Sequence, residues 1–284
     1  MKMETEKYFQ IVEIIRNYKG LSKDCLVELK HRFQDVPSNT LYSILSTEYQ
    51  KFMKQHYCKS SKRIEKYYSE YCKAIHKREE PGIILRMSKE NNLAPCLIGK
   101  LILQKYFEKK NGDADSNSDK SQQNINLYMR NTCLIPDTDL SYEIYLCTMY
   151  DDQYSPLVEV IKMSVGQEYE LLLERTLKEL GLAFRNEEYL RRYGYDKTPD
   201  IKMEIPIMID GVIINWIESK ALFGSEELHR EYFKNQYFSY WNRFGPGLVI
   251  YWFGFVETLI QTDDKRFIIR DNFPKDIADI TSLI

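Results

Sequence analysis

Hydrophobic residues recur every three or four positions through the first 110 residues, which is the period of an amphipathic helix. The spacing predicts four helices, over about residues 8–19, 22–33, 39–53 and 59–75. Gly20 is suited to end the first of them, Ser22 to cap the second, and Pro37 and Ser38 to precede the third. We therefore expect the N-terminal part of the chain to be a helical bundle.

Residues 82–108 predict two further helices joined by a tight turn, with Pro95 in the first turn of the second. The pair is compatible with a helix-turn-helix whose second helix enters a DNA groove. Many helical bundles contain the same geometry without binding DNA, so both interpretations stay open. The polar side chains expected on the outer face of the second helix are Lys100, Gln104 and Lys105.

The segment over residues 109–126 contains one isoleucine and no other large apolar residue. This composition is typical of a disordered insert or linker. It is the strongest signal for a domain boundary, and it divides the chain into a helical region over residues 1–108 and a second domain over residues 127–284.

The second domain is predicted to begin with helices. Residues 140–150 indicate a short helix or strand, and Ser155 and Pro156 open a long helical pattern that Gly181 ends. A helical start and an extended remainder would make this domain mixed α/β.

From Pro199 onward the hydrophobic period becomes that of strands. Apolar residues alternate from Ile201 to Ile209, Asp210 and Gly211 form a hairpin signal, and residues 212–220 return as the partner strand. Ser225 is suited to cap a helix that runs to about residue 243. Further strands are predicted over residues 248–256 and 266–270. The order of elements predicts an α/β sandwich around a central sheet.

Charge is distributed unevenly although the net charge is only -2. Residues 1–110 carry +9 and residues 155–284 carry -5. A basic first part would attract phosphates and an acidic second part would suit a carboxylate metal site, although basic helices are equally often simply solvated. One such helix has a basic face made of Lys59, Lys62, Arg63 and Lys66.

Composition excludes several other classes of protein. The six cysteines contain no CxxC pair, so a structural zinc site is not indicated. No apolar run approaches the roughly 20 residues of a membrane helix, and the first residues, MKMETEKYFQ, lack an apolar signal region. We expect an intracellular protein with no membrane partner.

Two carboxylates and a lysine form the main candidate for chemistry. Glu218 and Lys220 lie two apart on a strand, so they share a face, while Ser219 points the other way. Asp200 begins the preceding strand and reaches them only if a further bend intervenes. Carboxylates that hold Mg²⁺ or Mn²⁺ provide the means to hydrolyse a phosphodiester, and a lysine near a bound cation can have its pKa lowered.

Each of these signals is common when taken alone. A proline-aspartate pair and a Glu-x-Lys triplet occur widely, and strand ends often carry charges for solubility. Here, however, Glu218 and Lys220 end an apolar strand, where charges are unfavourable unless they line a cleft.

Other side chains are placed to support such a site. Gln236 and Tyr240 are four apart on the helix after the strand, so they share a face. Glu170 follows Gly166 on the helix before the sheet. The side chains that could contact nucleic acid near the cleft are Tyr240, Arg191, Arg192 and Lys197, although a solvated loop explains the last three equally well.

Four motifs follow one another in the order found in PD-(D/E)XK nucleases: GxxxE at residues 166–170, TPD at 198–200, WIESK at 216–220 and QxxxY at 236–240. The chain resembles these restriction-like and resolvase-like enzymes. More closely, KTPD, WIESK and the run over residues 239–255 are similar to the family of codanin-interacting nucleases. This second resemblance covers most of the chain.

The resemblance implies a restriction-endonuclease-like α/β C-terminal domain of the PD-(D/E)XK type and an all-α N-terminal region that contains a helix-turn-helix. It also implies DNA as substrate, Mg²⁺ or Mn²⁺ as cofactor, codanin as partner, a nuclear or nucleo-cytoplasmic location and a family role in erythroid differentiation.

Site residues carry over position by position. Asp200, Glu218 and Lys220 fall on the catalytic positions, Gln236 on a supporting glutamine, and Glu170 on an upstream helix acid that joins Asp200 and Glu218 as a metal ligand. Glu168 and Glu174 compete with Glu170 for that role. The alternative function is a non-catalytic scaffold that binds codanin through a nuclease-like fold.

Overall fold

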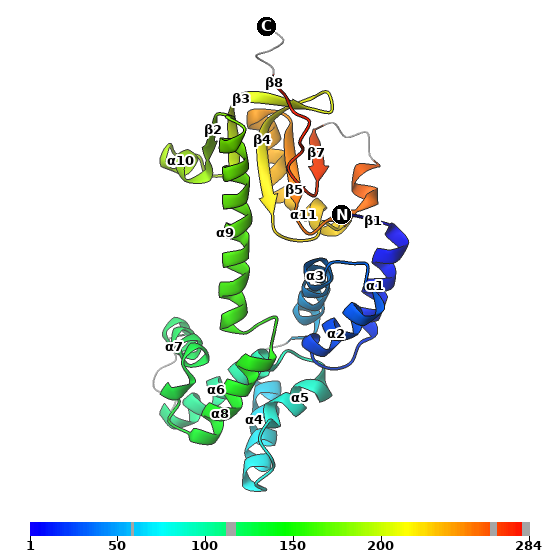
Figure 1. Cartoon of the computed structure of the whole chain (residues 1–284). Coiled ribbons are helices and arrows are strands. Elements are labelled where there is room, and N and C mark those ends of the chain that lie inside the picture. The colour runs from blue at the N-terminus through cyan, green and yellow to red at the C-terminus, as the bar shows by residue number, and fades with distance from the viewer. Residues whose placement is uncertain (58–59, 112–117, 262–265, 280–284) are drawn as a thin grey trace. The chain divides into compact units, whose positions relative to one another are not determined.

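The computed structural model describes residues 1–57, 60–111, 118–261 and 266–279, and these divide into two compact units (Figure 1). Unit 1 comprises residues 1–11, 36–43 and 163–284, and unit 2 comprises residues 12–35 and 44–162. The predicted boundary over residues 109–126 is therefore wrong. The described residues of this polar segment lie inside unit 2 and not between the units.

Unit 2 is helical throughout its described residues. It holds the second half of α1 (Thr5–Asn17) and most of α3 (Ser38–His56), together with the start of α9 (Pro156–Glu179). Its remaining elements are α2 (Ser22–Arg32), α4 (Ser61–His76), α5 (Ile83–Asn91), α6 (Pro95–Asn111), α7 (Ser118–Arg130), the short turn η1 (Thr132–Leu134) and α8 (Thr138–Tyr150).

The sequence predicted most of these helices, and the structure settles two details. Residues 140–150 are helical, and α6 begins at Pro95 as expected. Ser22, however, is the first residue of α2 and does not cap it, because the cap position is Leu21 and the Ser22 hydroxyl bonds instead to Asp152.

α6 lies at the centre of unit 2 and packs against α4, α5, α7 and α8. The core of the unit runs through it, with Ile98 and Ile102 fully buried. Lys105 pairs with Glu65 and Glu108, and Gln104 donates to Glu108, while Lys100 is partly buried. A helix covered on so many sides has little free surface for a DNA groove, so the structure favours the bundle interpretation of residues 82–108.

The predicted insert over residues 109–126 is also partly helical. α6 continues to Asn111 and α7 begins at Ser118, while residues 112–117 lie outside the described part of the chain. Ile125 and Met129 are buried in the core of unit 2. Ile125, the one large apolar residue of the segment, therefore anchors α7 together with Met129 just beyond it, which the low apolar content did not suggest.

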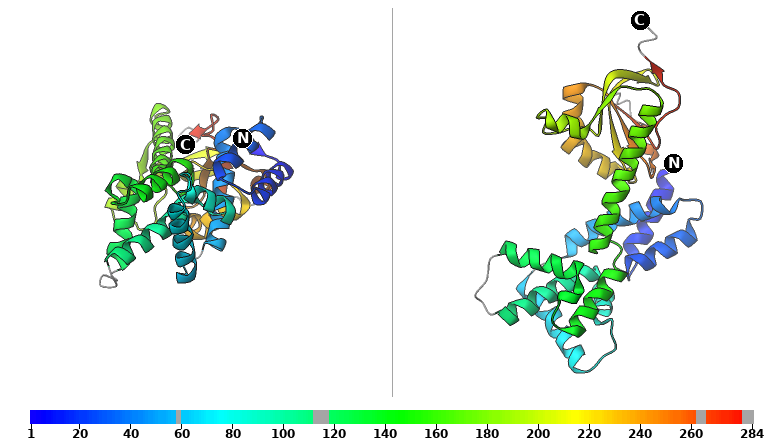
Figure 2. Two further views of the ribbon diagram at one scale, coloured as in Figure 1. Left: turned by 90° about the horizontal axis from the view of Figure 1, so that it is seen from below. Right: turned by 60° about the vertical axis from the view of Figure 1, so that its left-hand side comes forward.

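Unit 1 is built on a sheet whose described strands run in the order β2-β3-β4-β5-β7, with β8 beside β3 (Figure 2). β4 is parallel to β5, β5 is parallel to β7, and the other pairings are antiparallel. The strands are β2 (Phe184–Asn186), β3 (Ile201–Ile209), β4 (Val212–Lys220), β5 (Gly247–Tyr251), β7 (Phe267–Arg270) and β8 (Ala278–Asp279).

The β3–β4 hairpin turns at Asp210 and Gly211, as predicted, and both residues have positive φ angles. The register shifts between Lys202 and Ile207. This irregularity is the bend that the sequence required, because it brings the start of β3 opposite the end of β4.

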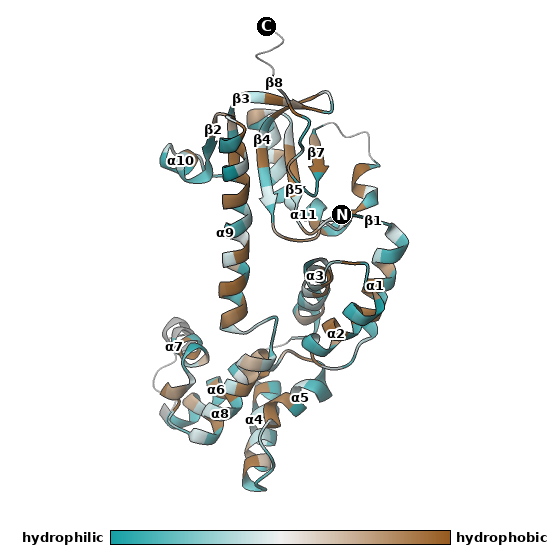
Figure 3. Cartoon of the chain, in the orientation of Figure 1, coloured by the Kyte–Doolittle hydropathy of each residue, from teal (hydrophilic) through white to brown (hydrophobic). Residues whose placement is uncertain are grey.

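Helices cover both faces of the sheet, and in Figure 3 the middle of β4 is hydrophobic while its end at Glu218 and Lys220 is hydrophilic. Leu173 and Leu177 of α9 pack on one face. The other face is covered by α11 (Glu226–Tyr232), the π-helical turn η2 (Phe233–Tyr237) and α12 (Phe238–Phe244). Ser225 caps α11 with its hydroxyl, as predicted. The short helix α10 (Glu187–Arg192) follows β2.

The first residues of the chain belong to unit 1. β1 (Lys2–Met3) pairs in parallel with β6 (Phe255–Val256), which precedes the turn η3 (Glu257–Ile260). Thr40 Oγ1 donates to Phe253 O at 2.7 Å, and Phe223 N donates to Ser43 Oγ at 2.8 Å. The single strand predicted over residues 248–256 is thus two strands, β5 and β6, and β6 pairs with β1 near the start of the chain.

The helices of the described ranges do not combine the length and apolar character that crossing a membrane would require.

Candidate active site

Asp200 and Glu218 lie side by side because Ile201 pairs with Ile217 across the hairpin. Ser219 N donates to Asp200 Oδ2 at 2.7 Å, and Asp200 N lies 3.4 Å from Glu218 Oε2. Ser219 itself faces the opposite side of the sheet, where Trp252 Nε1 donates to its hydroxyl at 2.8 Å. The structure therefore joins the two carboxylates that the sequence left 18 residues apart.

Lys220 shares the face of Glu218, and its Nζ lies 2.6 Å from Glu218 Oε1. The same ammonium group lies 4.6 Å from the ring centre of Tyr232, at the end of α11. Burial alone would lower the pKa of Lys220, but the attraction of Glu218 and Asp200 outweighs burial and the pKa is raised. Without a bound cation the lysine is therefore held in its charged form.

Both carboxyl groups have a raised pKa. Burial is the largest cause for Asp200, followed by repulsion from Glu218, and the shift takes its pKa well above the ordinary value. Burial is again the main cause for Glu218, and Lys220 opposes it. Lys220 alone cannot balance the charge of two buried, ionised carboxylates. A bound divalent cation would complete the charge balance.

Glu187 is a further carboxylate at this site that the sequence did not single out. Its Oε1 accepts from Thr198 Oγ1 at 3.1 Å and from Arg191 at 2.7 Å, and its backbone N donates to Asp200 O at 3.0 Å. These bonds tie the start of α10 to the turn before β3. The only signal in the sequence was an Asn186 cap followed by two glutamates, which marks a helix start and not a site.

Glu170 is the upstream acid that the electrostatics associate with the site. Its pKa is raised by burial first and then by Glu187, while Lys220 lowers it, so its carboxyl lies in the field of both groups. Glu174 is engaged by Asn186 at 3.2 Å and Lys178 at 3.1 Å. Glu168 and Glu170 are both at exposed positions, so the electrostatic link to Glu187 and Lys220 is what distinguishes Glu170. Glu170 therefore remains the best choice of the three.

Gln236 lies in the π-helical turn η2, between two residues that contact the site. In an α-helix, positions eight apart differ by about 80° of rotation, so Tyr232 and Tyr240 would not align. A turn with wider i→i+5 bonds absorbs an extra residue, so Tyr232 and Tyr240 can both pack on the same face of the sheet. Gln236 Oε1 is buried and has no hydrogen-bond partner among the described residues.

Tyr240 does not contact nucleic acid, because its side chain is 3% exposed. Its hydroxyl donates to Thr198 O at 2.8 Å, and its ring packs edge-on against Trp216. The QxxxY spacing was correctly placed on the site face of the helix, but the tyrosine supports the turn before Asp200 from inside the core.

Tyr240→Phe is expected to destabilise the chain by about 1–3 kcal/mol, because it leaves a buried carbonyl of Thr198 without its donor. Chemical denaturation of the variant and the native chain would measure this difference. Phe238→Leu, which changes an aromatic residue that is 45% exposed on the same helix, is the control and should cost much less. Equal stability of Tyr240→Phe and the native chain would contradict the assignment.

The three cations predicted at the mouth of the cleft are exposed, and each is already engaged. Arg191 pairs with Glu187, Arg192 pairs with Glu188, and Lys197 Nζ donates to Asn235 O at 3.0 Å. Carboxylates neutralise both arginines where they stand, so of the three only Lys197 lacks an acidic partner.

The residues present fit a hard divalent cation held by few protein ligands. Within the described ranges no three His, Cys, Asp or Glu side chains are disposed around one metal position, so the site is not a complete protein cage. Mg²⁺ retains several waters and needs only one or two carboxylates. Asp200 and Glu218 meet that requirement, and the free Gln236 Oε1 is an oxygen acceptor of the appropriate kind.

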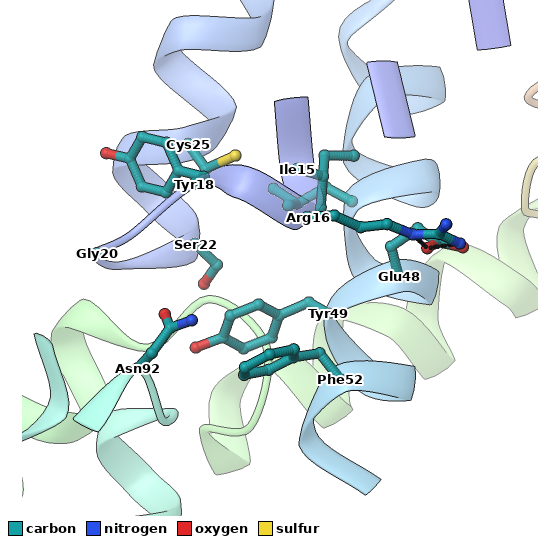
Figure 4. A pocket seen from close by; sticks show the side chains of 11 residues that line it. Ile15, Arg16, Tyr18, Gly20, Ser22, Cys25, Glu48, Tyr49, Phe52 and Asn92 are labelled. Carbon is teal, nitrogen blue, oxygen red and sulfur yellow. Dashed lines mark hydrogen bonds and ion pairs between the residues drawn. The ribbon is translucent and has the colours of Figure 1, made fainter. Parts of the chain in front are cut away.

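A pocket in unit 2 is separate from these groups. It is lined by Tyr18, Ser22, Tyr49, Phe52 and Asn92 among others, and the ion pair between Arg16 and Glu48 closes one side (Figure 4). None of the predicted site residues lines it. The chemistry of the chain therefore has to be sought in unit 1.

Comparison with known proteins first gives a class. A family model described as "Protein of unknown function TPD sequence-motif" matches residues 136–273, which include Thr198, Pro199 and Asp200. No solved structure matches the chain.

Curated relatives then give a family. The chain is 40% identical over 259 residues to CDAN1-interacting nuclease 1 of Homo sapiens, covering 90% of each protein. It is 41% identical over 261 residues to that of Danio rerio (91% of this chain, 85% of the relative) and 38% identical over 280 residues to that of Xenopus laevis (98% and 90%). The chain belongs to the CDAN1-interacting nuclease 1 family.

Proposed function

We propose that the chain is a metal-dependent deoxyribonuclease of the PD-(D/E)XK class, with a restriction-endonuclease-like fold in unit 1. The observation that carries the proposal is the placement of Asp200 beside Glu218, with Lys220 at 2.6 Å from the second acid. Two buried acids and one lysine at the end of an apolar strand are costly to maintain unless they perform chemistry.

Mg²⁺ or Mn²⁺ bound by Asp200 and Glu218 would supply charge neutralisation at the phosphate and a water of lowered pKa. Glu170, which forms no three-carboxylate group with them among the described residues, would reach the cation only through a bound water. Lys220, 2.6 Å from Glu218 Oε1, would orient the attacking water and balance negative charge on the phosphate. Tyr232 holds the ammonium in place through its ring.

The test is cleavage of labelled single-stranded, duplex and branched DNA with Mg²⁺ or Mn²⁺. We expect the native chain to cut and both Asp200→Asn and Lys220→Ala to be inactive. Glu188→Gln, which changes an exposed acid on α10, is the matched control and should retain activity. Equal cleavage by all four proteins would disprove the site, and folded but inert protein in every case would favour the scaffold function.

Codanin is the proposed partner. The proposed location is the nucleus, or both the nucleus and the cytoplasm. The support for the partner is the name of the relatives, which describes them as CDAN1-interacting, whereas the location rests on the sequence resemblance alone. Co-elution of the purified chain with codanin of the same species would test the partnership, and fluorescence imaging of the tagged chain would test the location. A role in erythroid differentiation belongs to the same proposal.

A further inference from the structure

One face of α4 is buried and the opposite face is basic. Ile64, Tyr67, Tyr71 and Ala74 pack into the core of unit 2. On the other side Lys62, Lys66, Lys73 and Lys77 are all exposed. We call these four residues the lysine row.

The lysine row is straight. At 100° per residue, the four positions fall within about 60° of one another around the helix. At 1.5 Å per residue, the row is about 22 Å long. It therefore presents four positive charges along one line, with the acidic Glu70 beside the line between Lys66 and Lys73.

These charges are little compensated within the described chain. Lys66 makes a long ion pair of 3.8 Å with Glu70, and Lys62, Lys73 and Lys77 have no polar or ionic partner among the described residues. The lysines of α6 differ, because Glu65 pairs with Lys105 at 3.3 Å and with Lys109 at 3.2 Å. The carboxylates of this bundle neutralise α6 and leave the row of α4 free.

Helix stability explains only half of the row. Cations in the last turn, such as Lys73 and Lys77, interact favourably with the helix dipole. Lys62 and Lys66 lie in the first two turns, where the dipole opposes positive charge, and the first turn of α4 contains no acidic residue. Cations kept at an unfavourable helix end point to a role in binding anions.

We propose that the lysine row binds the phosphate backbone of nucleic acid. Its length matches about six nucleotides of one strand at 3.4 Å each. This surface goes beyond the proposed function, because it requires only binding and no cleavage. It also moves the nucleic-acid contact of the helical unit from α6, where the sequence placed it, to α4.

An anionic membrane is a poorer match for the same charges. Helices that lie on membranes insert an apolar face, whereas the apolar face of α4 is occupied by the core. None of the exposed large hydrophobic residues found in the described chain lies on α4. A row of positive charges with no exposed apolar surface beside it therefore favours nucleic acid over an anionic membrane as the ligand.

The test measures binding of a fluorescein-labelled 20-base-pair DNA duplex by anisotropy, in EDTA so that no metal-dependent cleavage occurs. The full chain is compared with the variant Lys62→Gln, Lys66→Gln, Lys73→Gln and Lys77→Gln. Each lysine that neutralises a phosphate contributes about 0.9 to the slope of log affinity against log salt. We therefore expect the variant to lose about 3 to 4 units of slope and at least tenfold in affinity at 0.1 M salt.

A matched control removes the same charge from elsewhere in unit 2, through Lys19→Gln, Lys23→Gln, Lys30→Gln and Lys54→Gln, all at exposed positions. Circular dichroism verifies that both variants fold. Unchanged binding by the row variant, or an equal loss in the control, would overturn the proposal. Loss of binding to phosphatidylserine vesicles with DNA binding intact would also overturn it, in favour of a membrane. Cleavage does not enter the readout, so an inactive enzyme leaves the test valid.

Discussion

Asp200→Asn is expected to abolish cleavage and at the same time to raise the unfolding temperature of the metal-free chain. The activity loss follows from removing a proposed ligand, and several kcal/mol of lost transition-state stabilisation corresponds to about 10³-fold in rate. The gain in stability follows from the raised pKa of Asp200, whose ionised form is disfavoured by burial and by Glu218. An asparagine retains the oxygen that accepts from Ser219 N.

The pH dependence has a definite sign. The folded chain binds the Asp200 proton more tightly than the unfolded chain does, so native stability falls as pH rises from the unfolded pKa through the higher folded pKa. Asparagine does not titrate, so the advantage of the variant should grow over that pH interval.

Thermal unfolding between pH 4 and 8, with and without Mg²⁺, would measure both effects. Mg²⁺ should stabilise the native chain and leave the variant unchanged. Glu188→Gln again serves as control and should follow the native curve. A variant that is less stable than the native chain at every pH would show that the two acids do not repel one another.

Gly247→Ala is expected to destabilise unit 1 severely. A Cβ at this position would lie 2.1 Å from Cε2 of Trp216, a side chain that is fully buried. Trp216 is also fixed by its Nε1, which donates to Gly245 O at 2.9 Å, so it cannot yield. Overpacking of a rigid core costs about 3 kcal/mol, and more when backbone must move.

Gly166→Ala is the matched control, because a Cβ there would meet nothing within 4 Å. It lies inside α9, where alanine is preferred over glycine by about 1 kcal/mol. We expect this variant to be more stable than the native chain, and denaturant unfolding would rank all three. A mild effect of Gly247→Ala would mean that Trp216 can adopt another rotamer.

Local structure in unit 1 could be predicted from sequence because each signal was local. The alternation from Ile201 to Ile209 and the Asp210-Gly211 turn define one hairpin, and that hairpin fixes the neighbours of Glu218. The closeness of Asp200 depended on a register shift between Lys202 and Ile207. No periodicity reports such a shift, so only the structure could show it.

The remaining features depend on contacts distant in sequence. Glu187 became part of the site through its bonds to Thr198 and Asp200, and Tyr240 became a buried support through its bond to Thr198 O. The sequence of α6 was compatible with a helix that enters a DNA groove. It carries no information about the four other helices that cover α6 in the fold. Contacts between residues that are far apart in the sequence produce no regular spacing, so a sequence pattern cannot predict them.

Unit 1 is composed of three separated stretches of chain, and this imposes an order on its synthesis. β1 is made more than 250 residues before its partner β6. All of unit 2 is complete before that partner exists. During translation residues 1–11 therefore lack their partners in unit 1, and closure of unit 1 must be a late event with a large loop entropy.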